Sequence, residues 1–150
     1  MNIFEAIRAD HEKQRTLLGI LTKTHGDSEG REELYARLKR ELESHESAEE
    51  RFFYIPLLQD DLTQVKARHS VAEHHEIDEL IEKLDSTEFS SSAWLTYAKQ
   101  LHERVEHHLT EEEHEVFQMA GKVLSAARKE SLANEYQAEM ERLRLEHESV

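Results

Sequence analysis

The residues most able to do chemistry in this sequence are histidines and glutamates that recur four positions apart. His45 with Glu49, and His108 with Glu112, each place an imidazole and a carboxylate on one face of a helix, about 6 Å apart along its axis. Both pairs begin the same pattern, His-x-x-x-Glu-Glu-x-x-apolar-aromatic. Imidazole nitrogens and carboxylate oxygens that face one small volume are typical ligands of a transition-metal ion.

The second copy of this pattern can be aligned on either of two adjacent histidines. Alignment on His108 puts Val116 at the apolar position, whereas alignment on His107 puts Glu115 there. We therefore prefer His108 and expect His107 to point outward.

Two further histidines interrupt apolar stripes of the kind that bundle helices bury. His11 lies seven residues after Phe4 and seven before Leu18, and His74 lies three residues after Val71. Each stripe is apolar except near its middle, so the histidines of the four helices fall at a similar depth.

Burying several histidines and glutamates at one depth in a dry core carries a free-energy cost that some interaction must offset. A buried carboxylate or imidazole without a partner is costly, and a pair of cations would remove that cost. Glutamates can also bridge two metal ions, which lie roughly 3.5–4 Å apart in two-metal sites. The predicted metal ligands are His11, His45, Glu49, His74, His108 and Glu112. No catalytic residue and no organic cofactor is predicted.

The elements that must hold these residues are helices, because Pro (1) and Gly (4) are scarce and 35% of the residues are charged. We predict an all-α fold, an antiparallel up-down-up-down four-helix bundle with an additional C-terminal helix. We expect residues 1–120 to form the metal-binding bundle, and the helix within 121–150 to pack on it or to form a homo-oligomer contact. The predicted helices are 2–24, 29–55 (ended or kinked by Pro56), 62–84, 92–119 (with a possible interruption at Ala120 and Gly121) and 123–145.

Composition excludes several classes of function. The formal net charge of −14 argues against nucleic acid as a partner, and the absence of cysteine excludes disulfides and thiolate sites. The N-terminal residues lack the apolar core of a signal peptide, and no run approaches the 18 apolar residues of a membrane span. We therefore expect a cytoplasmic protein without a membrane partner.

Four short motifs, taken in order, resemble the hemerythrin-like HHE cation-binding family. They are Asp10-His11, His45-x-x-x-Glu49-Glu50, Glu73-His74-x-x-Ile77 and His108-x-x-x-Glu112-Glu113, and the likeness spans about residues 3 to 120. The resemblance implies a non-haem di-iron centre with a bridging oxygen species. It makes the four histidines terminal ligands and the two glutamates bridges, with a small molecule such as O2 as the exogenous ligand. Zinc and manganese are the other candidate metals.

One position departs from the oxygen-carrying members of that family. Asp78 stands where they have a fifth histidine, so it is either a carboxylate ligand or a surface residue, and simple oxygen carriage is in doubt. Oxygen sensing and iron or redox handling by a binding protein are favoured over an enzyme. The alternatives are a di-iron oxidase, a peroxide-consuming enzyme, or a zinc-stabilised interaction module.

The remaining polar residues near these motifs have simpler interpretations. Glu50 and Glu113 are expected to be exposed charges or hydrogen-bond partners of the ligand imidazoles, and Glu46 is a possible extra ligand. The other histidines are expected to be solvated or to point outward: His25, His69, His75, His102, His114 and His147.

Overall fold

The structure, a computed structural model, describes residues 1–26 and 28–148 of the chain. Throughout these residues the regular elements are helices: α1 (Ile3–Leu21), α2 (Glu29–Glu49), α3 (Ile55–Leu58), α4 (Gln64–Asp85), α5 (Ser92–Glu111), α6 (Phe117–Val123) and α7 (Ala126–Glu148). Two π-helical turns, η1 (Glu50–Tyr54) and η2 (Glu112–Val116), join α2 to α3 and α5 to α6 without a break. The predicted all-α fold is confirmed.

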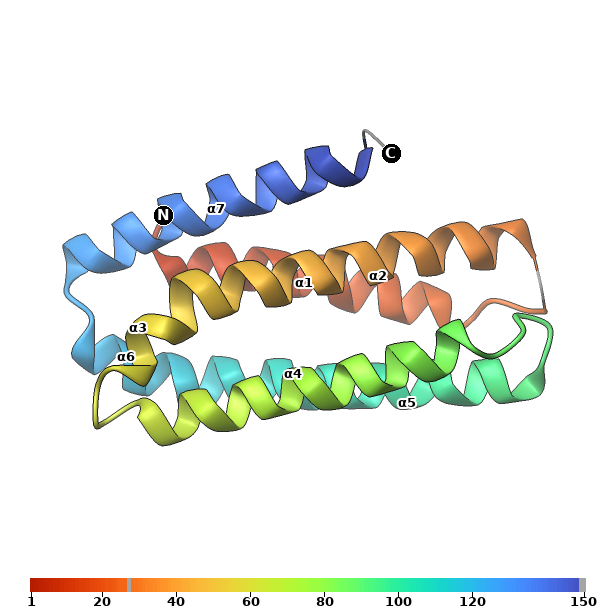
Figure 1. Cartoon of the computed structure of the whole chain (residues 1–150), viewed down its shortest axis with the longest axis horizontal. Helices are drawn as coiled ribbons and strands as arrows, with labels where there is room; N and C mark the ends of the chain where they lie inside the picture. Colours follow the sequence, from red (N-terminus) through yellow and green to blue (C-terminus); the bar gives the residue numbers. More distant parts are fainter. Residues whose placement is uncertain (27, 149–150) are drawn as a thin grey trace.

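The four long rods run up, down, up and down, and α7 lies alongside α1 and α2 on the side away from α4 and α5 (Figure 1). Polar caps start three of the rods, and Ser91 provides the one on α5, where its side chain accepts from the Ala93 amide. Asn2 and Glu5 form a reciprocal capping box on α1, and the Ser28 side chain accepts a hydrogen bond from the Arg31 amide of α2. Gly26 has φ of 57°, a left-handed conformation that suits glycine in the turn after α1.

The π turns correct two sequence-based predictions. The predicted helix end at Pro56 was wrong, because Ile55 is helical and the rod continues to Leu58, whereas a kink there stays a prediction. Pro56 lies in the first turn after η1, where a missing amide N–H costs little. The predicted interruption at Ala120 and Gly121 was also wrong, since α6 runs through both residues to Val123.

The boundaries of α4 and α7 also differ from the prediction. The Asp60 carboxylate accepts from the Leu62 amide in a short turn, and α4 starts at Gln64, two residues later than expected. The break before α7 falls at Leu124, whose backbone is extended, so α7 begins at Ala126.

The bundle contains two hydrophobic cores at opposite ends. The first core lies where α1 begins and includes Ile3, Phe53, Phe117 and Tyr136, so it draws on both π turns and on α7. The second core lies where α1 ends and is formed by α1, α2, α4 and α5 around Leu18, Leu38, Trp94 and Leu101. The apolar stripe of α7, formed by Leu132, Ala133, Tyr136 and Met140, is buried in this first core and so packs against its own bundle.

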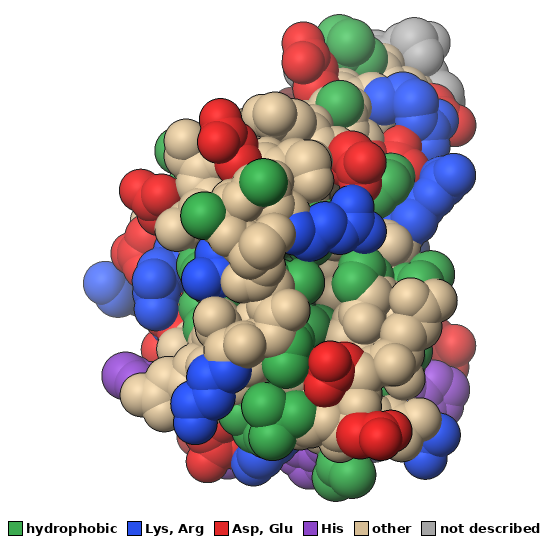
Figure 2. Space-filling view, turned by 90° about the vertical axis from the view of Figure 1, so that its left-hand side faces the viewer, with side chains coloured by type: hydrophobic (Ala, Val, Ile, Leu, Met, Phe, Trp, Pro, Cys, Tyr) green, Lys and Arg blue, Asp and Glu red, His purple; other side chains and the backbone are tan. Residues whose placement is uncertain are grey.

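The end of the molecule beside the first core exposes several apolar side chains between patches of both charges (Figure 2). Leu62 and Val65, which follow α3 and begin α4, are among the exposed large apolar residues of the chain. None of the helices in the described ranges is long and apolar enough to cross a lipid bilayer.

Candidate metal centre

The middle of the bundle, between the two cores, holds six polar side chains that are almost fully buried; we call them the central donor set. They come from all four rods, and they are His11 of α1, His45 and Glu49 of α2, His74 of α4, His108 of α5 and Glu112 of η2. His11, Glu49 and Glu112 have no exposed surface, and the other three expose at most 4%. The structure thus brings together all six residues that the sequence singled out.

The central donor set divides into two overlapping groups of four residues. One contains His11 and His45 with both glutamates, and the other contains His74 and His108 with both glutamates. Within each group the four ligand atoms lie within 4.8 Å of one another. Both groups share Glu49 and Glu112, so the arrangement matches two neighbouring cations with two common carboxylates.

Each glutamate presents one oxygen to each group. Glu49 places Oε2 3.4 Å from Nε2 of His45 and Oε1 3.1 Å from Nε2 of His74. Glu112 places Oε1 3.0 Å from Nε2 of His11 and Oε2 3.7 Å from Nε2 of His108. Bonds of about 2.0–2.2 Å to one tetrahedral metal ion would set neighbouring ligand atoms about 3.3 Å apart, so these separations suit a shared ion.

Several inward atoms of the central donor set lack a hydrogen bond of acceptable geometry. They are Nε2 of His11, Nε2 of His45, both oxygens of Glu49 and Oε1 of Glu112. In the metal-free site these buried atoms lie in ion-pair contacts of 3.0 to 3.4 Å, and a buried polar atom without a well-formed hydrogen bond is unfavourable. Cations bound between these atoms would give each of them a partner, so the chemistry of the donor set fits bound metal ions.

The outward nitrogen of three histidines is held by a carboxylate. Nδ1 lies 2.8 Å from Glu113 for His11, 3.1 Å from Glu50 for His74 and 2.8 Å from Glu73 for His108. An ionised carboxylate can only accept, so Nδ1 of each of these histidines carries a proton and Nε2 is the atom that faces the centre. This confirms that Glu50 and Glu113 are hydrogen-bond partners of the imidazoles.

The fourth histidine is oriented by α7. The Tyr136 hydroxyl donates to Oδ2 of Asp10 at 2.6 Å and lies 2.6 Å from Nδ1 of His45, from which it accepts. Asp10 is held in turn by Arg144, whose guanidinium donates to Oδ1 at 2.8 Å. The C-terminal helix therefore completes the same outward arrangement that carboxylates provide for the other three imidazoles.

Two histidine nitrogens that face each other also favour a bound cation at the centre. Nε2 of His74 lies 3.1 Å from Nε2 of His108, while both Nδ1 atoms are occupied by glutamates. With protons on Nδ1, two lone pairs would face each other, which is unfavourable unless a cation or a proton lies between them.

In the metal-free site, burial and neighbouring charges shift the pKa values of several members of the central donor set. Burial raises the pKa of Glu112 well above its usual range, and the charge of Glu49 adds to this effect. Burial also acts on Glu49, but His45 and His74 outweigh it and lower the pKa of that carboxyl. Burial lowers the pKa of His11 to about 4, whereas the contacts of His74 with Glu49 and Glu50 overcome burial and raise its pKa to about 10. Without cations, the site thus keeps protons that metal ions would displace.

Tyr54 of η1 adds a seventh polar group beside the donor set. Its side chain is fully buried, and its hydroxyl forms a short hydrogen bond with Oε2 of Glu112. The turn explains this placement, since the amide of Ile55 bonds the carbonyl of Glu50 five residues earlier. The extra residue turns Phe53 and Tyr54 inward and leaves Phe52, seven residues after His45, only partly buried.

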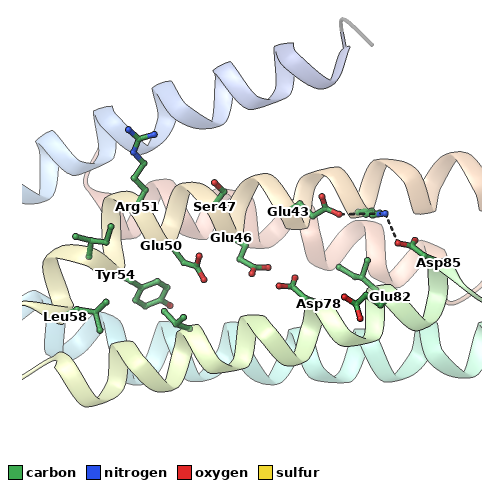
Figure 3. Close-up of a pocket in the computed structure, with 14 residues that line it drawn as sticks. Glu43, Glu46, Ser47, Glu50, Arg51, Tyr54, Leu58, Asp78, Glu82 and Asp85 are labelled. Carbon is green, nitrogen blue, oxygen red and sulfur yellow. Dashed lines mark hydrogen bonds and ion pairs between the residues drawn. The ribbon is translucent and has the colours of Figure 1, made fainter.

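An open groove of about 800 Å³ runs between α2, η1 and α4 and reaches Tyr54. Glu46, Glu50 and Asp78 project into it, and the side chains of Glu46 and Asp78 point toward each other (Figure 3). Burial, followed by the contact with Asp78, raises the pKa of Glu46 to about 9. Asp78 and Glu46 lie outside both four-residue groups of the central donor set.

Sequence reasoning missed three residues that contact the central donor set: Glu73, Tyr54 and Tyr136. The only signal for Tyr136 was a phenol in the apolar stripe of the last helix. His107 and His114 are exposed, as expected from the preferred alignment.

Fold and site together define an all-helical protein with a buried set of metal-binding side chains. A sequence comparison agrees: the model of the hemerythrin HHE cation binding domain matches residues 2–120. The chain belongs to this family of metal-cation-binding proteins.

Two individual proteins are also similar to the chain. A hemerythrin HHE cation-binding-domain protein from Mycobacterium kansasii superimposes with a TM-score of 0.87 at 23% identity, covering 96% of this chain and 88% of that one. A protein described as a DNA nickase from Nostoc sp. (strain PCC 7120 / SAG 25.82 / UTEX 2576) is 27% identical over 92% of this chain. The chain spans only 39% of the length of that relative.

Proposed function

We propose that this chain is a non-haem di-iron protein that binds or senses O2 or another small oxidant, or handles iron. The irons would be held by His11 with His45 and by His74 with His108, and Glu49 and Glu112 would bridge them. The observation that carries the proposal is the pair of overlapping four-residue groups that share both glutamates. Iron bound there would supply redox chemistry toward oxygen species. A cytoplasmic location stays a prediction.

The surrounding residues prepare the site for that chemistry. Phe117 stacks on the His11 ring at 6.3 Å, and Phe53 packs against Phe117, which keeps this side of the centre apolar. Four outward hydrogen bonds fix the imidazoles with Nε2 facing inward. The groove that ends at Tyr54 is the route we propose for a small exogenous ligand.

A peroxide-consuming enzyme is the second candidate, and Tyr54 is the observation that favours it. Its phenol proton lies beside Glu112 and at the end of the groove, where it can be passed to a bound oxidant. Reduction of a peroxide to two waters takes two electrons and two protons; two ferrous ions in the centre would supply the electrons, and Tyr54 could supply one of the protons. Asp78, at the position of the carriers' fifth histidine, also favours chemistry other than reversible oxygen carriage. We do not transfer nickase activity, because the net charge of −14 opposes binding to phosphates.

Metal analysis and an absorption spectrum of aerobically purified protein test the proposal. We expect about two irons per chain and an iron charge-transfer band in the near ultraviolet. A colourless protein that retains one zinc would contradict it and support the zinc-stabilised module instead. Turnover of added peroxide would then separate the enzyme from the binding protein.

A matched pair of variants tests the ligand assignment. His108→Ala should lose iron, whereas His114→Ala should retain it, because His114 is exposed six residues further along the same rod. Equal loss in both variants would overturn the alignment of the second motif.

A further inference from the structure

A second group of metal-binding side chains lies outside the central donor set, between α4 and α5; we call it the outer cluster. It consists of His69 and Glu73 of α4 with His107 and Glu111 of α5. Both imidazoles are exposed, Glu111 is partly buried, and Glu73 exposes only 5% of its surface. The cluster is thus open to solvent on one side and anchored by a buried carboxylate on the other.

The outer cluster is built by the same spacing as the centre. His69 with Glu73, and His107 with Glu111, are again His-x-x-x-Glu pairs, so each places an imidazole and a carboxylate on one helix face. The pair on α5 precedes His108 and Glu112 by one residue, which rotates it about 100° around the helix axis and out of the bundle.

Ligand atoms of His69, Glu73 and Glu111 lie within 4.8 Å of one another, and His107 approaches the two carboxylates from the α5 side. Glu111 lies between the histidines, with Oε1 3.1 Å from Nε2 of His69 and Oε2 3.2 Å from Nε2 of His107. Oε2 of Glu73 lies 3.6 Å and 3.8 Å from the same two nitrogens. These separations bracket the distance of about 3.3 Å between neighbouring ligands of a tetrahedral ion with bonds of 2.0–2.2 Å.

We propose that the outer cluster binds a divalent transition-metal ion of the Zn²⁺ or Fe²⁺ class. Two imidazoles and two carboxylates are a ligand set that such ions accept, whereas Ca²⁺ and Mg²⁺ prefer oxygen alone. The proposal does not depend on the metal content of the centre, because none of its four ligands belongs to the central donor set.

The outer cluster and the centre share one carboxyl group. Oε1 of Glu73 accepts from Nδ1 of His108 at 2.8 Å, while Oε2 faces the exposed histidines. A cation at the outer cluster therefore draws on the same carboxylate that orients a residue of the centre. Occupancy outside should change the donor strength of His108 inside.

An exposed His–Glu ion pair on the same helix provides the control. His75 and Glu79 of α4 have the same spacing, with Nε2 3.3 Å from Oε1, but both side chains are more than half exposed. The contact recorded for His75 in the described structure is with Glu79 alone. One imidazole and one carboxylate make a weak metal site, so this pair represents an ordinary ion pair.

Zinc binding at equilibrium tests the proposal. Dialysis against Zn²⁺ should give one more bound ion per chain in the wild type than in His69→Ala/His107→Ala, and an unchanged number in His75→Ala/His114→Ala. The difference of one ion is expected whether the centre is filled or empty, so the result is separate from the di-iron proposal. Equal numbers in all three proteins, or the same loss in the control, would overturn the outer site.

NMR signals of the histidine rings give a second, independent measurement of Zn²⁺ binding at the outer cluster. The ring signals of His69 and His107 should shift together on addition of Zn²⁺, and those of His75 should stay in place. Equal shifts at His75 would reduce the binding to nonspecific association with exposed ion pairs and contradict the proposal.

Discussion

The two cores of the bundle lie on either side of the central donor set and are filled in different ways. The second core is largely aliphatic, and its polar group Tyr35 bonds Asp85 and the carbonyl of Ile81, away from the centre. The first core is rich in aromatic residues, and its Tyr54 and Tyr136 hydroxyls bond directly to Glu112 and His45. One core is scaffold alone, whereas the other is both scaffold and part of the site.

The largest effects should come from matched deletions in the two cores. Leu38 in the second core and Leu57 in the first are fully buried and lie on the same rod. Leu38→Ala and Leu57→Ala should each cost about 2–5 kcal/mol of unfolding free energy, because each leaves a cavity. Only Leu57→Ala should also speed iron release to a chelator, since Leu57 packs in the cluster of Phe53 and Tyr54. Denaturant titration and chelation kinetics measure both quantities, and equal release rates would erase the proposed distinction.

The pH dependence of the metal-free protein should reveal the protonated histidine of the centre. The pKa of His74 is raised to about 10, above its unfolded value of 6.5, so its contribution to stability is complete below pH 6.5 and is lost as the pH rises through 10. Metal-free protein should therefore lose stability between pH 7 and 10, and His74→Gln should flatten that decline. Denaturation midpoints of the metal-free wild type and of His74→Gln across this pH range measure the decline in stability. A flat profile for the wild type would show that His74 is neutral in the fold.

The same protons should leave when metal binds. The raised pKa values of His74 and Glu112 favour their protonated forms in the metal-free state. Metal binding should thus release about two protons per chain. Calorimetric titrations in buffers of different ionisation enthalpy count them, and release of none would contradict the proposed protonation.

Two tyrosine variants sharpen the comparison between the cores further. Tyr136→Phe removes the acceptor of the His45 Nδ1 proton and should weaken metal binding about 10–100-fold. Tyr35→Phe removes a hydroxyl of the second core and should cost about 1 kcal/mol of stability without changing metal affinity. Metal competition assays and denaturant titration check the pair. Equal metal affinities of the Tyr136→Phe and Tyr35→Phe variants would mean that α7 covers the site without affecting metal binding.

Helix caps should give the smallest effects, and the two ends should behave alike. Asn2 caps α1 beside the first core, and Ser28 caps α2 beside the second. Asn2→Ala and Ser28→Ala should each cost about 1 kcal/mol, because each removes the side-chain acceptor of one backbone amide, that of Glu5 or that of Arg31. Thermal unfolding measures this, and neither variant should change the iron content.

The sequence predicted the central donor set because α-helical periodicity holds as far as Glu49 and Glu112. Beyond these residues each rod enters a π turn, whose extra residue shifts the buried face from Phe52 to Phe53 and Tyr54. No local pattern marks such a turn, so Tyr54 was missed and Pro56 was misinterpreted as the end of a helix.

Contacts between side chains of different helices were the other feature that the sequence could not predict. Tyr136 reaches His45 only because α7 folds back onto α1 and α2, and spacing within one helix carries no information on that packing. His69 and His107 were expected to be solvated or to point outward, and each is exposed in the folded chain. Their convergence on Glu111 depends on the register between α4 and α5.

X-ray diffraction at the iron absorption edge, from crystals of aerobically purified protein, tests the central claim most directly. We predict two anomalous peaks, roughly 3.5–4 Å apart, each next to two of the four histidines and both next to Glu49 and Glu112. A single peak, or peaks away from these six side chains, would contradict a shared two-iron centre.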